Sequence, residues 1–186
     1  RNTFKPYASC LLTHPAIDAA RRLAGELGGS DVREVRVLVH PLAPQVAGKP
    51  APRTPLEGKF SLAYCVAIGL RGYSAQAQDF SPQRLHEPAV RALLERIRVQ
   101  AHGSMGKTSA RLEVDLADGR TLRAEVPVAL GNPENPMGWD AMEAKFMSLT
   151  EPVLAERARP LFAALRRFEA PGAFAETLAL VEGRQP

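Results

Sequence analysis

Residues 110–128 decide the fold, and they read ARLEVDLADGRTLRAEVPV. Apolar and charged residues alternate over 110–116, which is typical of a strand with one buried and one exposed face. Asp118-Gly119 is a turn signal, and the alternation resumes over 122–128. The stretch therefore predicts an antiparallel hairpin.

Further elements are predicted outward from this hairpin. The alternating valines of 35–39 indicate one more strand, and residues 96–102 indicate another. Residues 41–55 hold five prolines. Proline has no N–H to donate to a neighbouring strand and disrupts helical turns, so we expect a long loop there. Apolar spacing and capping signals predict helices over 14–27, from Thr54 through the apolar 60–70 stretch, and over 87–95, 140–150, 152–168 and 173–182.

This order of elements favours an α+β fold. We expect a mostly antiparallel sheet of about four strands with helices packed on it, and three helices at the C-terminal end. At 186 residues, 45% of them hydrophobic, the chain can bury a core of its own and fits one domain over 1–186. Its first residue is Arg1, so we expect the chain to be part of a longer protein.

Composition disfavours several classes of function. The 24 basic residues exceed the 20 acidic ones only modestly and form no dense runs, which argues against nucleic-acid binding. No apolar stretch is long enough to span a membrane. The two cysteines have no Cys-x-x-Cys spacing and the four histidines form no cluster, so no metal site and a reducing cytoplasm are expected.

The segment from Lys5 to His14 gathers residue types that chemistry uses. It places an ammonium, the Cys10 thiol and an imidazole just before a predicted helix start, where free backbone N–H groups favour an anion. A carboxylate could dock there. The alternative is that Thr13 and His14 only cap the helix and that Cys10 is a small buried hydrophobic residue.

A second such segment runs from Lys59 to Cys65. Tyr64 shares a helical stripe with Phe60 and Ile68, so its ring is expected to be buried. An acid-base role for its hydroxyl competes with simple packing in which the hydroxyl has a hydrogen-bond partner. On the same helix, Lys59 would lie about 140° around the axis from Tyr64. The alternative to a role in the site is that Lys59 is an ordinary solvated surface lysine.

Two loops complete the candidates. Residues 102–107 contain glycine and lysine but lack the spacing of a nucleotide phosphate loop, so a turn between strands is expected. Residues 131–136 read GNPENP and precede the first of the three C-terminal helices.

At these residues the chain resembles the MmgE/PrpD family. The resemblance rests on Phe4-Lys5-Pro6-Tyr7 with Cys10 and Thr13-His14-Pro15, on the stretch EGKFSLAYCVA at 57–67, and on GNPENPM at 131–137 with Lys145-Phe146. It implies relatives that are 2-methylcitrate dehydratases of propionate metabolism, cis-aconitate decarboxylases and iminodisuccinate epimerases. In them a helical N-terminal domain joins a smaller α+β domain, and this chain resembles only the latter.

The resemblance also implies a site. Lys5 looks like the family's substrate-carboxylate lysine and Tyr64 like its cleft tyrosine, with Cys10, His14 and Lys59 near the same cleft. Some relatives have His where this chain has Cys10, which affects substrate choice. Tyr64, Lys5 and His14 are therefore the predicted catalytic residues, and Lys5, Cys10 and Lys59 the predicted substrate-binding ones, without metal or organic cofactor.

The function expected from this resemblance is that of a lyase domain acting on small polycarboxylates. The missing helical domain supplies other acid-base residues in the relatives, so the chain alone is expected to be inactive. A homodimer is expected as well. Two alternatives stay open: a non-catalytic folding and dimerisation module, and an epimerase of an aspartate-derived diacid.

Overall fold

The computed structural model describes residues 2–183 and divides into two compact units. Unit 1 is Arg1–Pro136 and unit 2 is Met137–Pro186. Each unit is described by its own contacts. The expectation that residues 1–186 form one domain stays a prediction.

Unit 1 is built on a four-stranded sheet with the order β2-β1-β3-β4. The strands are β1 (Val32–Val39), β2 (Ile97–Ala101), β3 (Ala110–Leu116) and β4 (Thr121–Val126). β3 pairs antiparallel with both β1 and β4, whereas β1 and β2 are parallel. The predicted α+β class and mostly antiparallel sheet are confirmed, and the hairpin turn contains Gly119 at a φ of +90°, which favours glycine.

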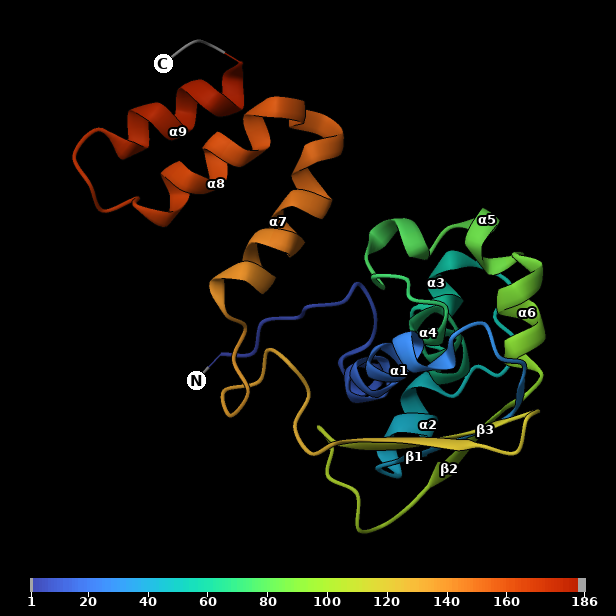
Figure 1. Ribbon diagram of the computed structural model, residues 1–186. Coiled ribbons are helices and arrows are strands. Elements are labelled where there is room, and N and C mark those ends of the chain that lie inside the picture. Colours follow the sequence, from blue (N-terminus) through green and yellow to red (C-terminus); the bar gives the residue numbers. More distant parts are fainter. Residues whose placement is uncertain (1, 184–186) are drawn as a thin grey trace. The chain divides into compact units, whose positions relative to one another are not determined.

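Helices cover one face of this sheet (Figure 1). α1 (His14–Leu27) packs on β3, β4 and α4, and α4 (Leu62–Leu70) packs on α1, α6 (Pro88–Leu94) and β2. Every residue of α4 is buried, as expected of a helix that is apolar on all sides. Gly69 permits the close packing of the two central helices, because a Cβ there would lie 2.8 Å from the Cβ of Ala20.

The opposite face of the sheet is charged. Alternation along the strands buries Val35 and Val37 under the helices and leaves Arg36 on the other face. The Arg36 guanidinium lies 2.6 Å from a carboxylate oxygen of Asp115 and 3.1 Å from one of Glu113. An ion-pair network thus follows the polar face across β1 and β3.

Two predictions about the middle of the chain were wrong. The proline-rich segment 41–55 contains the helix α2 (Leu42–Ala47), in which Pro44 falls in the first turn, where a missing N–H is tolerated. The helix expected from Thr54 through 70 is two helices, α3 (Pro55–Gly58) and α4, because Ser61 is extended and caps α4. The remaining short elements of unit 1 are η1 (Leu11–Thr13), η2 (Ala77–Asp79) and α5 (Pro82–Leu85).

Unit 2 consists of the three predicted C-terminal helices. They are α7 (Trp139–Leu154), α8 (Ala158–Arg166) and α9 (Ala173–Glu182), with the short η3 (Ala155–Arg157) between the first two. α7 continues through Pro152, where a helix boundary was expected, and ends where Ala155 takes a φ of +48°. Among residues 2–183, no helix combines the length and apolar character needed to cross a membrane.

Candidate functional site

The N-terminal segment, residues 4–13, is held in place by backbone hydrogen bonds to two distant loops. The Ala8 N–H donates to the Ala75 carbonyl over 3.0 Å, and the Cys10 N–H donates to the Lys59 carbonyl over 2.9 Å. The Gln76 side-chain amide donates to the Pro6 carbonyl over 2.7 Å. The structure therefore brings together the two segments in which the sequence predicted site residues.

Cys10 lies at the centre of this junction and is half-buried. The Thr13 hydroxyl donates to the Cys10 carbonyl over 2.8 Å and lies 2.8 Å from the Ser9 hydroxyl oxygen, so it does not cap α1. The second cysteine, Cys65, is fully buried, and burial raises the pKa of its thiol to about 12. Cys65 is thus a neutral packing residue, whereas Cys10 retains partial access to solvent.

His14 lies beneath the N-terminal segment as the first residue of α1 and is fully buried. Its Nε2 atom lies 3.4 Å from the Ser9 carbonyl oxygen, and its ring contacts the Tyr7 ring edge-on at a centroid distance of 5.2 Å. These contacts fix the orientation of the imidazole beneath the segment.

Tyr64 is positioned by the start of α4. The Ser61 hydroxyl accepts the Tyr64 N–H over 3.1 Å, and the tyrosine side chain is completely buried. Its hydroxyl donates to the Asp79 carbonyl over 2.5 Å, and its ring lies 5.8 Å from the Phe80 ring. Burial, with the nearby charge of Asp79, raises the pKa of Tyr64 well above its usual value. The predicted burial of its ring is confirmed, and the hydroxyl stays protonated at neutral pH.

Lys59 and Lys5 differ in placement. Lys59 caps the end of α3, so its predicted position on the helix of Tyr64 was wrong. Its ammonium lies 6.0 Å from the centroid of the Phe80 ring, which in turn contacts Tyr64. Lys5 is exposed, and its neighbour Phe4 donates its N–H to the Gly131 carbonyl over 2.9 Å. Cys10, Lys59 and Tyr64 are thus close in the fold, while Lys5 lies further along the segment.

A second polar group near the segment was not predicted. The Tyr7 hydroxyl donates to the Asp18 carboxylate, whose other oxygen accepts the Leu130 N–H over 2.8 Å. The Arg21 guanidinium lies 5.7 Å from the Tyr7 ring centroid. Burial, and then the charge of Asp18, raises the pKa of Tyr7 above its usual value. An open depression of about 400 Å³ is lined by Tyr7, Asp18, Arg21, Arg22, Leu130 and Asn135.

The sequence contains a signal for the pairing of Tyr7 with Asp18. Asp18 falls on the apolar stripe of α1 one turn after His14, and a carboxylate at a buried helix position needs a partner. Tyr7 belongs to the same motif as Lys5. Arg21 is exposed, and its guanidinium lies over the Tyr7 ring.

A buried polar network supports the carbonyl that holds Tyr64. The Asp79 carboxylate is buried and accepts the Ser74 hydroxyl over 2.8 Å and the Gln76 N–H over 3.2 Å. The side-chain amide of Gln76 in turn donates to the Pro6 carbonyl, so one loop fixes both Tyr64 and the N-terminal segment. These supporting residues are spread over 74–79, where the sequence has no regular pattern.

This arrangement offers ammonium groups and a neutral phenol. Lysine ammoniums stabilise carboxylates, and a protonated tyrosine donates a hydrogen bond or a proton. Within residues 2–183, no group of three or more His, Cys, Asp or Glu side chains is arranged to hold a metal ion. The predicted absence of a cofactor stays a prediction.

Comparison with known proteins identifies the family. A search of curated proteins gives no match. A family model described as the MmgE/PrpD C-terminal domain matches residues 7–167, which covers most of the chain. The match includes the N-terminal segment from Tyr7 onward, the Lys59–Tyr64 region and the sheet. The chain therefore belongs to the MmgE/PrpD family and represents its C-terminal domain.

Proposed function

We propose that this chain is the C-terminal domain of a lyase that acts on small polycarboxylates, of the 2-methylcitrate dehydratase or cis-aconitate decarboxylase type. The observation that carries the proposal is the hydrogen bond from Cys10 to Lys59, which joins two motif segments far apart in the sequence. Membership of the family supports a lyase reaction in general. The substrate is inferred from the ammonium groups near this junction.

The proposed roles follow from charge and protonation. Lys5 and Lys59 bind substrate carboxylates, and their positive charges stabilise the negative charge that develops during elimination or decarboxylation. Tyr64 carries its proton at neutral pH and donates it to the Asp79 carbonyl, so in the proposed role of acid this hydrogen bond is exchanged for one to substrate in the completed cleft. Cys10 lines the substrate side of the junction, and the buried His14 orients the segment that carries Lys5 and Cys10.

The proposal includes a partner, a helical domain that completes the cleft. Tyr64 is fully buried whereas Lys5 is exposed, so the two side chains do not face one open cavity within unit 1. A partner surface placed over the N-terminal segment would enclose substrate against the ammonium groups. We therefore expect this chain alone to be inactive, and a homodimer to be the active assembly.

The test is turnover of an enzyme that combines this chain with a helical domain of the family. Tyr64→Phe keeps the ring packing and is expected to lower kcat by roughly 10²–10⁴-fold, the usual contribution of a general acid or base. Lys5→Ala is expected to raise KM for 2-methylcitrate or cis-aconitate, while Lys107→Ala, a substitution of another exposed lysine, leaves both constants unchanged. Unchanged turnover in Tyr64→Phe and Lys5→Ala would contradict the proposed roles. Product analysis separates elimination from epimerisation of a diacid.

A second candidate function is a non-catalytic folding and dimerisation module. It is favoured by the large apolar side chains that unit 2 leaves exposed, among them Trp139 (55% exposed), Val153 (77%) and Phe174 (66%). Sedimentation analysis across protein concentrations tests it. Because the lyase proposal also includes a homodimer and a cleft completed by a helical domain, the deciding measurement adds a helical domain of the family. Self-association that is lost in Val153→Asp, with no turnover of polycarboxylates when that domain is present, would favour this module over the enzyme domain.

A further inference from the structure

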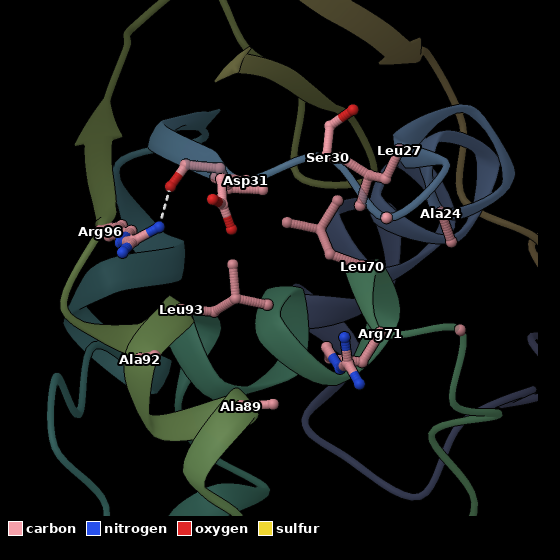
Figure 2. A pocket seen from close by; sticks show the side chains of 13 residues that line it. Ala24, Leu27, Ser30, Asp31, Leu70, Arg71, Ala89, Ala92, Leu93 and Arg96 are labelled. Atoms are coloured by element: carbon pink, nitrogen blue, oxygen red, sulfur yellow. Dashed lines mark hydrogen bonds between the residues drawn. The ribbon is translucent and has the colours of Figure 1, made fainter. Parts of the chain in front are cut away.

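A cavity of about 380 Å³ lies in unit 1. Its walls come from the C-terminal end of α1, the turn at 29–32, the end of α4 and one side of α6 (Figure 2). Its lining includes none of the residues proposed above for the lyase site. Volumes of about 300–1,000 Å³ are usual for ligand sites, so this cavity suits a small molecule.

Part of the cavity lining is apolar. Leu27, Leu70 and Leu93 are buried and contribute side chains to it. The remaining wall positions on α1 and α6 are alanines, namely Ala24, Ala89 and Ala92. Larger side chains at these three positions would reduce the cavity, so the small residues maintain its volume.

The rim of the cavity is charged. Arg71 and Arg96 contribute guanidinium groups and Asp31 a carboxylate, and all three residues are exposed. Arg96 donates to the Val32 carbonyl, which fixes its side chain at the rim. In the view of Figure 2, Leu93 lies between Arg96 on one side and Arg71 on the other.

From these features we propose that the cavity binds a small organic monocarboxylate with a compact apolar body. Among the residues that line the cavity, two guanidinium groups stand against one carboxylate, which favours an anionic group on the ligand. Guanidinium groups hold carboxylates through charge-assisted hydrogen bonds, and the apolar body would cover the leucines of the lining.

The same features disfavour tricarboxylates such as citrate in this cavity. Once a carboxylate lies at each guanidinium group, a third would have to lie against the leucines or beside Asp31, and both placements are unfavourable. The cavity and the proposed lyase site therefore differ in the ligands that they select. Free aliphatic acids and apolar amino acids share the required chemistry, and Asp31 distinguishes them because it can bind the ammonium group of an amino acid.

The test is a titration of this chain, with its leucine methyl groups labelled, followed by NMR. The probes are 3-methylbutanoate, leucine, uncharged 3-methylbutanol and citrate. We expect saturable shifts of the Leu27, Leu70 and Leu93 methyl signals with 3-methylbutanoate or leucine, and none with citrate. If leucine is the better ligand, Asp31→Asn should remove its advantage over 3-methylbutanoate.

Matched variants decide whether the charged rim is responsible for binding of the carboxylate. Arg71→Ala is expected to weaken binding by about 10-fold, the usual effect of losing a charge-assisted hydrogen bond. Arg91→Ala is the control, since Arg91 is an exposed arginine of α6 outside the lining. Ala92→Phe, at an exposed wall position, should abolish binding by filling the cavity. The proposal fails if no carboxylate shifts these methyl signals, if 3-methylbutanol binds as well, or if Arg71→Ala and Arg91→Ala behave alike.

Discussion

Units 1 and 2 reach stability in different ways. Unit 1 has a wholly buried helix, α4, packed against helices and strands that come from distant parts of the sequence. Unit 2 has a cluster of three buried residues, Leu161, Ala164 and Leu180, and its helices contact their neighbours along the chain. Unit 1 should therefore unfold cooperatively, whereas unit 2 should open locally at a lower free energy.

The largest expected effect comes from one substitution made in each unit. Leu112→Ala removes a fully buried side chain of β3 and should lower the stability of unit 1 by about 2–5 kcal/mol. Leu180→Ala removes one of the three buried residues of the unit 2 cluster, and should release the amides of α8 and α9 while those of unit 1 stay protected. Native-state hydrogen exchange measures both. Equal loss of protection in the two units after either substitution would refute the difference.

The second-largest effect on stability is expected at the contact between Phe4 and Gly131, near the two ends of unit 1. Gly131 has a φ of +88°, and a Cβ there would lie 1.9 Å from the Phe4 carbonyl oxygen. Gly131→Ala should cost about 2–4 kcal/mol, because backbone strain and overpacking add. Gly72→Ala is the control, since Gly72 has a φ of +80° with no atom within 4 Å of its Cβ position. Chemical denaturation of both variants isolates the contact with Phe4, and equal stability losses would mean that this contact contributes nothing.

A smaller effect is expected where the two central helices touch. Gly69→Ala would place a Cβ 2.8 Å from the Ala20 Cβ and should destabilise unit 1 by about 1–3 kcal/mol. Gly25→Ala, on α1 with open space around it, should instead stabilise by roughly 0.5–1 kcal/mol. Thermal unfolding gives the sign of each change. A stabilising Gly69→Ala would show that the helices can separate without cost.

The smallest effect lies on the polar face of the sheet. Hydrogen bonds from Arg36 and Thr121 hold the pKa of Asp115 below its usual range. A lowered folded-state pKa contributes stability that is present above the unfolded value, about 3.9, and is lost as the pH falls below it. The stability difference between wild type and Asp115→Asn should therefore shrink in acid, as measured by urea unfolding from pH 2 to 7. Glu26→Gln, at an exposed position on α1, is the control, and an identical pH profile for both variants would contradict the assignment.

Regular patterns in the sequence predicted most of the fold. The alternation at 110–116 gave β3, and the start signals at Thr13–Pro15 with the glycines at 28–29 gave α1, whose end is set by a Gly28 φ of +54°. The break at Lys59–Ser61 was missed because a capping signal at Thr54 and an apolar run beyond it suggested one helix. Pro152 was read as a boundary, yet α7 continues through it, so a local rule was overridden.

The candidate site was less predictable. Motif residues such as Tyr64 and Cys10 could be named, but the hydrogen bonds that bring them together come from backbone groups, which carry no sequence signature. The Asp79 carbonyl that holds Tyr64 is one example. The Tyr7–Asp18 pair differs, since a carboxylate on the apolar stripe of α1 is visible in the sequence but its partner is not.

The contact between Phe4 and Gly131 has a topological consequence. It holds the two ends of unit 1 side by side, so the order of the elements between them is effectively cyclic. Such a unit tolerates circular permutation, because a short linker can join the adjacent ends while the chain is opened at a surface turn such as the one at Gly119. For the same reason, the unit can be inserted into a loop of another domain. Its chain would enter and leave at one point, so neither core has to rearrange.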